Sequence, residues 1–139
     1  MSSVHLERET LEPGWARPIW NDLELVERVL EASAASDVGV ASELANHLFA
    51  AGGKRIRPAL VILSARALGA DRDSRIVELA AATELVHTAS LVHDDVVDQA
   101  RFRRGVCTAS AKWGNRLSVL GGDFLLARAF ALLTEVGNP

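Results

Sequence analysis

The feature that most constrains the fold is a stretch from Ile76 to Asp98 that contains no glycine or proline. It is rich in alanine and leucine, and Asp73 or Ser74 can cap its start, so the sequence predicts one long helix. At about 100° per residue, Asp94 and Asp98 lie one turn apart on a single face. Two carboxylates in this position repel each other and oppose the helix dipole. A bound cation would reverse both penalties.

The ligand preferences of magnesium match this pair of carboxylates. Mg²⁺ prefers oxygen, keeps several waters, and is usually held by one or two carboxylates together with substrate phosphates. Asp94 and Asp98 are therefore the candidate metal ligands, and His87, seven residues before Asp94, shares their stripe. A solvated acidic helix end is the alternative. The arginines that follow argue against it, because Arg103 and Arg104 carry planar guanidinium groups suited to phosphate.

A second cluster of charge, Gly52 to Pro58 (GGKRIRP), lies about forty residues earlier. The paired glycines end one helix and allow the backbone to approach a ligand closely, and proline is tolerated in the first turn of the next helix. Lys54 and Arg57 are three residues apart and project from the same side of that helix start, where backbone N–H groups attract anions. The spacing differs from that of a nucleotide P-loop. A basic, solvent-facing helix start is the alternative interpretation.

Composition and net charge argue against several classes of function. A chain of 139 residues forms at most one domain, and 49% apolar with 24% charged residues is typical of a soluble helical protein. The net charge of −3, without a recurring basic and aromatic stripe, argues against nucleic acid. Arg66, Asp123 and Arg128 interrupt the longest apolar runs, so we predict no membrane span. The single cysteine, Cys107, rules out an internal disulfide, and all of this fits the cytoplasm.

Hydrophobic periodicity predicts an all-α fold that follows an irregular segment over residues 1–18. The expected helices cover residues 20–35, 38–50, 55–69, 74–98 and 116–135. Inside the last of them, Gly121 and Gly122 each cost about 1 kcal/mol relative to alanine. Close helix packing explains this cost best, and a hinge is the alternative.

Three segments together resemble the trans-polyprenyl diphosphate synthases, which belong to the all-α isoprenyl synthase family. They are GGKRIRP (52–58), ELVHTASLVHDDVVDQARFRRG (84–105) and WGNRLSVLGGDFLLARAF (113–130), in the family's order and spacing. The resemblance implies an antiparallel helix bundle of the isoprenyl synthase type, assembled as a homodimer or a heterodimer. It also implies a prenyltransferase that condenses isopentenyl diphosphate with an allylic prenyl diphosphate.

The resemblance also implies a role for each candidate residue. Asp94 and Asp98 would bind the Mg²⁺ ions that bridge to the allylic diphosphate, and Arg103 would contact that diphosphate. These three would be the catalytic residues. The residues expected to hold isopentenyl diphosphate are Lys54, Arg57, His87 and Arg104. Neutralisation by metal and arginine is what makes diphosphate a good leaving group.

Product length is predicted from the positions just before the aspartate motif. In this family, bulky side chains there close the pocket and stop chain growth. Ala89 and Ser90 occupy these positions and are both small. The sequence in this region resembles the long-chain synthases that make quinone side-chain precursors. We therefore expect a long-chain product, unless another helix closes the pocket.

The resemblance fails after Arg104. The family carries a second aspartate-rich motif in its C-terminal half, whereas only Asp123 and Glu135 are acidic here. We expect residues 1–139 to form one partial synthase domain, roughly the N-terminal half, with apolar faces left uncovered. A non-catalytic regulatory or partner subunit is the first alternative, and the intact aspartates and arginines argue against it. A cyclising or head-to-head terpene enzyme is the second, and GGKRIRP with His87 argues against cyclisation.

Overall fold

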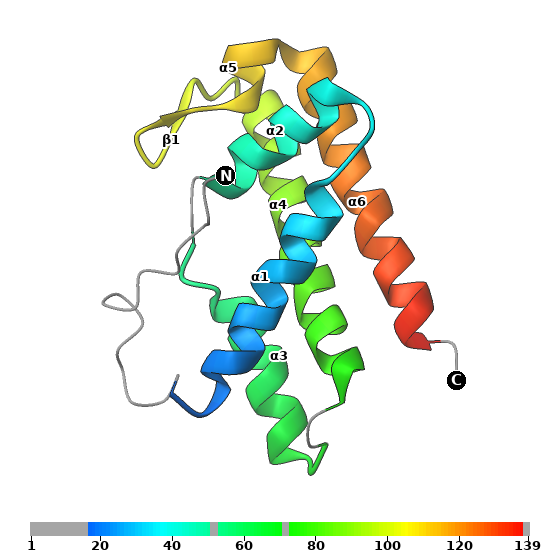
Figure 1. Cartoon of the computed structure of the whole chain (residues 1–139). Helices are drawn as coiled ribbons and strands as arrows, with labels where there is room; N and C mark the ends of the chain where they lie inside the picture. Colours follow the sequence, from blue (N-terminus) through cyan, green and yellow to red (C-terminus); the bar gives the residue numbers. More distant parts are fainter. Residues whose placement is uncertain (1–16, 51–52, 71–72, 138–139) are drawn as a thin grey trace.

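The computed structural model describes residues 17–50, 53–70 and 73–137. In these residues, six α-helices and one small hairpin follow a short 3₁₀ turn (Figure 1). The elements are the turn Arg17–Ile19, α1 Trp20–Ala34, α2 Gly39–Ala50, α3 Ile56–Ala67, α4 Ser74–Val97, β1 Phe102–Arg103, β2 Val106–Cys107, α5 Ala109–Trp113 and α6 Asn115–Gly137. The all-α prediction is confirmed, and each predicted helix end lies within two residues of the observed one. Of the predicted irregular segment, residues 1–16 lie outside the described residues.

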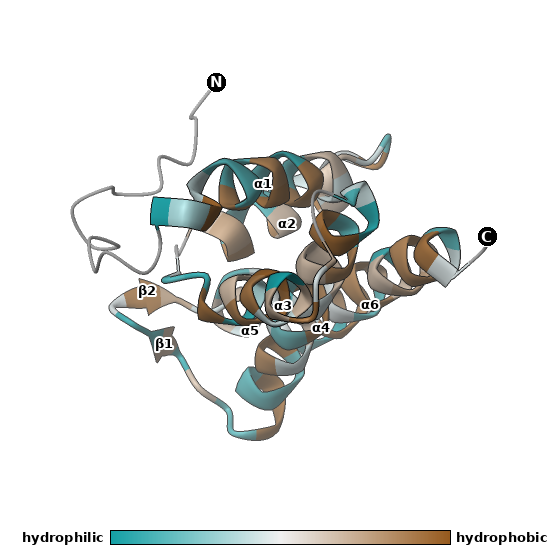
Figure 2. Cartoon of the chain, turned by 90° about the horizontal axis from the view of Figure 1, so that it is seen from below, coloured by the Kyte–Doolittle hydropathy of each residue, from teal (hydrophilic) through white to brown (hydrophobic). Residues whose placement is uncertain are grey.

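Helix α4 is the centre of the bundle, and α1, α3 and α6 pack against it (Figure 1). It begins where the sequence indicates, because the carboxylate of Asp73 accepts a hydrogen bond of 3.0 Å from the backbone N–H of Arg75. In the view of Figure 2, α1 and α2 lie above α3, α4 and α6. The long helix with the aspartates at its end is therefore held from several sides.

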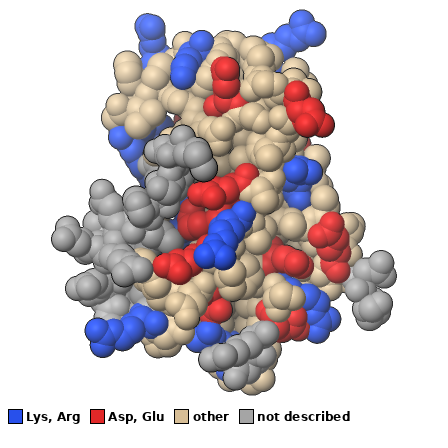
Figure 3. All heavy atoms as spheres, viewed as in Figure 1, with Lys and Arg blue, Asp and Glu red and all other residues tan. Residues whose placement is uncertain are grey.

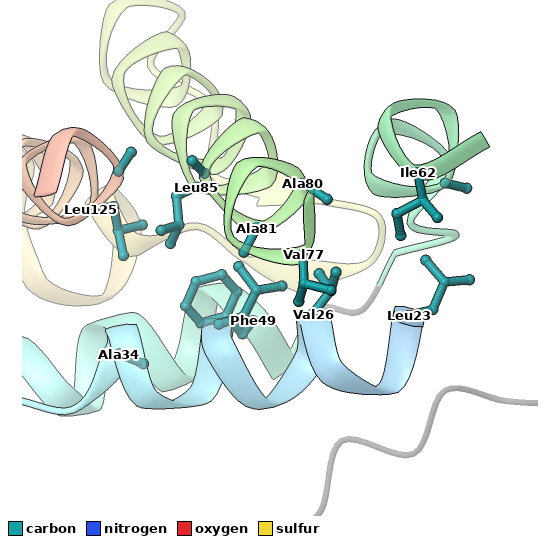
Figure 4. Packing of buried hydrophobic residues seen from close by; sticks show 14 of the residues in the cluster. Leu23, Val26, Ala34, Phe49, Ile62, Val77, Ala80, Ala81, Leu85 and Leu125 are labelled. Carbon is teal, nitrogen blue, oxygen red and sulfur yellow. The ribbon is translucent and has the colours of Figure 1, made fainter. Parts of the chain in front are cut away.

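The core forms where the apolar sides of five helices meet (Figure 4). Val26 of α1 lies beside Val77 of α4, and Leu23 of α1 points towards Ile62 of α3. Helix α4 presents small residues such as Ala80 and Ala81 to its neighbours. Burying a leucine or valine side chain stabilises the fold by about 1.5–3 kcal/mol. The opposite side of α1 is charged, and Figure 3 shows acidic and basic side chains together on this face of the molecule. Helix α1 is thus an amphipathic cover for the bundle.

The two glycines of α6 lie at close helix contacts, as predicted. A Cβ atom on Gly121 would lie 2.2 Å from Cδ2 of Leu44 on α2, and one on Gly122 would lie 2.3 Å from Nε2 of His93 on α4. Either separation is far below an ordinary carbon contact of about 3.5–4 Å. The hinge interpretation is therefore not needed.

The hairpin and α5 were not predicted from the sequence. The strands have two residues each, with Arg103 paired to Val106, which is too short for a visible alternation. Arg104 and Gly105 form the turn with φ values of 52° and 79°, the left-handed conformation that two-residue hairpin turns favour. Helix α5 is only five residues long and is capped by the Thr108 hydroxyl.

Several large apolar side chains are exposed on α3, α4 and α6, among them Leu60, Val97 and Phe130. Helix α6 is also long and apolar enough to cross a membrane, judged by length and composition alone. One such helix is a weak indication, because core helices of soluble proteins meet the same criterion, and α6 packs along α4. The expectation that the chain has no membrane span stays a prediction.

Candidate functional site

A cavity of about 560 Å³ opens between three parts of the chain. Its lining comes from the end of α2 (residues 47–49), the residues before and at the start of α3 (53–57), one side of α4 (84–95), and the hairpin with the start of α5 (103–109). The apolar part of the wall includes Leu48, Leu91 and Val92. Segments that lie far apart in the sequence therefore meet around one partly apolar pocket.

The basic residues singled out in the sequence meet at this cavity. Those that line it are Lys54, Arg57, His87, Arg103 and Arg104. Two acidic side chains, Glu84 and Asp95, also lie in the wall. Five arginine or lysine residues, with Arg55 included, outnumber the two carboxylates around the pocket. The site is therefore positive, and several of its cationic side chains can bind phosphate oxygens at once. The first glycine of the motif, Gly52, lies outside the described residues, whereas Gly53 is part of the cavity wall.

Arg103 is fixed by a carboxylate that sequence reasoning did not assign to the site. Its Nε and Nη2 atoms lie 2.9 and 2.7 Å from Oδ1 of Asp95. The hydrogen bond that Arg103 donates to Asp95 raises the pKa of Arg103, and the charges of Asp94 and Asp98 act in the same direction. Asp95 is buried, unlike the two aspartates beside it in the motif. The sequence does show that Asp95 points about a quarter-turn away from Asp94 and thus towards different neighbours. It does not show that Arg103 is the partner.

The hairpin that carries Arg103 and Arg104 is anchored at its base. His47 Nε2 of α2 lies 2.8 Å from the carbonyl oxygen of Cys107. The Thr108 hydroxyl donates a 2.6 Å hydrogen bond to the carbonyl of Ala100, so the two ends of the hairpin segment are joined. The hairpin is thus connected to α2, to α4 and across its own base.

The loop before α3 is organised around a buried ion cluster. Arg55 adopts the left-handed conformation, with φ 49° and ψ 34°, and its guanidinium donates to Glu27 through Nε and Nη2 and to Glu84 through Nη1. Burial alone would lower the pKa of Arg55, but the hydrogen bonds and charges of the two glutamates outweigh it and raise the pKa. Lys54 and Arg57, on either side of Arg55, are exposed. The buried arginine therefore leaves its basic neighbours available for a ligand.

His87 lies on the α4 side of the cavity. Burial and the positive charge of Arg57 lower its pKa, with smaller contributions in the same direction from Arg104 and Arg103, while Glu84 opposes the shift. The lowered pKa favours the neutral imidazole in the ligand-free site, and a neutral imidazole can donate one hydrogen bond to an anion.

Asp94 and Asp98 lie at the end of α4, exposed to solvent and outside the cavity lining. They are one helical turn apart, as the backbone hydrogen bond of 2.8 Å from Asp98 N to Asp94 O shows. Within the described residues, no group of three or more His, Cys, Asp or Glu side chains is arranged to hold a metal ion. Two exposed carboxylates with room for waters fit Mg²⁺, which takes most of its remaining ligands from water and phosphate.

The two positions expected to control product length lie apart from the cavity. Ala89 is buried in the core, and Ser90 is exposed with its hydroxyl bonded to the carbonyl of His87 at 2.7 Å. Neither residue lines the cavity between the basic side chains. Their role in product length stays a prediction.

Comparison with known proteins gives a consistent result. Residues 39–139 match the polyprenyl synthetase family. The heptaprenyl diphosphate synthase component 2 of Geobacillus stearothermophilus is 50% identical over 86% of this chain, and the octaprenyl diphosphate synthase of Escherichia coli is 47% identical over 74%. The crystal structure of a polyprenyl synthase from Caulobacter crescentus, complexed with calcium and isoprenyl diphosphate, superimposes on 89% of this chain with a TM-score of 0.85 and 47% identity.

These matches cover the chain far better than they cover the relatives. The chain spans 37% and 32% of the two curated relatives, and 38% of the Caulobacter structure. The decaprenyl diphosphate synthase structure from Rhodobacter capsulatus gives the same picture, with a TM-score of 0.84 and 38% of its chain covered. The match extends over most of the helices, the loop before α3 and the hairpin. The chain therefore belongs to the polyprenyl synthetase family.

Proposed function

We propose that the chain provides the first substrate-binding part of a prenyltransferase, which condenses isopentenyl diphosphate with an allylic prenyl diphosphate. The observation that carries this proposal is the convergence of five basic side chains from three segments on one cavity of about 560 Å³. A diphosphate needs several fixed cations, and an isoprenoid tail needs an apolar wall. The cavity offers both, and the relatives are named as polyprenyl diphosphate synthases.

In this proposal, two groups of residues handle the two diphosphates. Lys54, Arg57, His87 and Arg104 hold isopentenyl diphosphate. Arg103 contacts the allylic diphosphate, with its guanidinium kept in place by Asp95 at 2.7 Å. Asp94 and Asp98 would hold Mg²⁺, which acts as a Lewis acid and neutralises the leaving diphosphate when it is bound.

The residues of the chain then support a prenyl transfer from which water is excluded. The allylic carbon–oxygen bond breaks, and the diphosphate leaves with the electron pair. The isopentenyl double bond forms the new carbon–carbon bond with the allylic cation, and a proton is lost to restore a double bond. Arg103 stabilises the charge that develops on the leaving group. Apolar wall residues such as Leu48, Leu91 and Val92 exclude the water that would capture the cation.

A turnover assay tests the proposal directly. The chain is incubated with farnesyl diphosphate, labelled isopentenyl diphosphate and Mg²⁺, alone and as a fusion to the remaining part of the Geobacillus relative. We expect an elongated product from the fusion at least, and loss of product when Arg103 is changed to alanine. Arg101→Ala is the matched control, because Arg101 is an exposed arginine of the same segment outside the cavity lining. Equal losses in both variants would contradict the assignment of Arg103.

Product length is the finer part of the proposal. A long-chain product is expected because Ala89 and Ser90, just before the proposed metal-binding carboxylates, are both small side chains. Replacing both with phenylalanine in the active fusion should shorten the product. An unchanged product distribution would show that another helix limits chain growth.

A heteromeric partner role is the second candidate. Two relatives, from Geobacillus stearothermophilus and Bacillus subtilis, are named component 2 of a heptaprenyl diphosphate synthase. The chain would then act with a second, different chain instead of as a homodimer, in the cytoplasm in either case. Asp94→Ala distinguishes a catalytic from a regulatory subunit. It should abolish Mg²⁺-dependent binding of the allylic diphosphate in the former and leave partner stimulation intact in the latter.

A further inference from the structure

The loop before α3 has a backbone conformation that requires an explanation. Arg55, the residue that precedes the first turn of α3, has φ 49° and ψ 34°. A side chain with a Cβ atom rarely adopts this left-handed region, and it persists only where the surroundings hold it. Glycine would be the usual choice at such a position. Because an arginine stands here in place of glycine, the interactions of its side chain must hold the backbone in this conformation.

The side chain of Arg55 is held mainly by Glu27 of α1, which lies outside the cavity. Two carboxylate oxygens of Glu27 accept from Nε and Nη2 of Arg55, whereas Glu84 accepts through one oxygen at 3.3 Å. The Glu27 side chain is 10% exposed and that of Arg55 is 5% exposed. A buried ion pair rarely stabilises a fold more than well-packed apolar residues would. The ion pair does provide a fixed geometry, because the planar guanidinium donates two parallel hydrogen bonds to a carboxylate in one orientation.

The fixed guanidinium in turn defines the backbone that carries the anion-binding side chains. A Cβ atom on Gly53 would lie 3.1 Å from Nη1 of Arg55, so the loop rests closely on the guanidinium. Lys54 and Arg57 flank Arg55 and line the cavity. Any rotation of Arg55 about its backbone would change the directions in which both neighbours project.

We propose that Glu27 is a positioning residue that aims Lys54 and Arg57 at a bound diphosphate by holding Arg55 in its left-handed conformation. The inference rests on the proposed function, since it assumes that the cavity binds diphosphate. Glu27 touches neither the ligand nor the cavity and acts from α1 through one guanidinium. Glu84 is different, because it lines the cavity, and its Oε2 is buried without a hydrogen-bond partner among the described residues. Its charge would act on the ligand directly.

Inorganic diphosphate is the probe for the test, with its affinity measured by calorimetry for the chain and its variants. Glu27→Gln keeps the shape but presents an N–H₂ group to the guanidinium. We expect about tenfold weaker binding, the loss that follows when a charge-assisted hydrogen bond is misaligned. Asp22→Asn is the matched control, because Asp22 pairs with Arg66 between the same two helices, away from the cavity. It should bind diphosphate as the unmodified chain does, even though its stability also decreases.

A structural measurement separates positioning from a general loss of stability. The amide resonances of residues 53–57 should shift in Glu27→Gln and stay in place in Asp22→Asn. Gly53→Ala presses on the same guanidinium without changing any charge, and it should weaken binding in the same way. Unchanged affinity in Glu27→Gln or in Gly53→Ala would overturn the inference while leaving the diphosphate site intact. Failure of the unmodified chain to bind diphosphate would overturn the site itself, and the inference with it.

Discussion

The contact between α6 and α2 allows a quantitative test of the fold. In Gly121→Ala, the new Cβ would lie 2.2 Å from Cδ2 and 2.9 Å from Cδ1 of Leu44. Leu44 is only 2% exposed, so its side chain has little space to move away. Overpacking of this kind costs about 1–3 kcal/mol. The better helix propensity of alanine returns about 1 kcal/mol. The net loss in the free energy of unfolding should therefore be about 1 kcal/mol, with about 2 kcal/mol as the upper limit.

Three further variants attribute the loss to this contact. Gly137→Ala makes the same substitution in α6, where nothing lies within 4 Å of the new Cβ, and it should leave stability unchanged or slightly increased. Leu44→Ala alone should cost about 2–5 kcal/mol through the cavity that it creates. In the double variant Leu44→Ala/Gly121→Ala the new methyl group finds space, so the two losses should not add. Urea unfolding of all four variants measures the coupling. Additivity within about 0.5 kcal/mol would refute the packing argument.

Three further predictions concern the site. Asp95→Asn should destabilise the chain by about 1 kcal/mol, because one charge-assisted interaction is lost while the partly exposed Arg103 can be solvated. Amide hydrogen exchange in the hairpin should become faster in this variant. Unchanged exchange would contradict the anchoring role of Asp95. Diphosphate binding should raise the pKa of His87, since an anion favours the imidazolium. An NMR titration of the His87 ring protons with and without diphosphate measures the change, and an unchanged pKa would contradict the placement of His87 at the ligand. Because burial and nearby cations lower the pKa of His87, the unfolded chain binds more protons below about pH 6.5, so stability should decrease as the pH falls through that value. His87→Asn should reduce this pH dependence, and an identical profile would refute the assignment.

The helical framework could be predicted from the sequence because its signals are local. The absence of glycine and proline between Ile76 and Asp98, together with the Asp73 cap, was enough to define α4. The close approach at Gly121 and Gly122 was also predictable, because a glycine pair inside a helix costs too much without a packing reason. Neither signal depends on knowing which helices are neighbours.

The organisation of the site could not be predicted in the same way. Arg55 and Glu27 are 28 residues apart in the sequence, and nothing in either local pattern identifies them as partners. The same is true of His47 and the carbonyl of Cys107, which are separated by 60 residues. Such pairs are created by helix packing and depend on where each element lies in the bundle. The sequence therefore indicated which basic residues meet at the cavity, but not which residues hold them in place.

The anchored hairpin has a thermodynamic consequence for any anion that binds beside it. Ordering the backbone of a flexible segment costs about 1–2 kcal/mol per residue in lost conformational entropy. Here the segment that carries Arg103 and Arg104 is already connected to α2, to α4 and across its own base. That entropy is lost when the chain folds, before a ligand arrives. Diphosphate should consequently bind without a large unfavourable entropy from ordering the arginine segment.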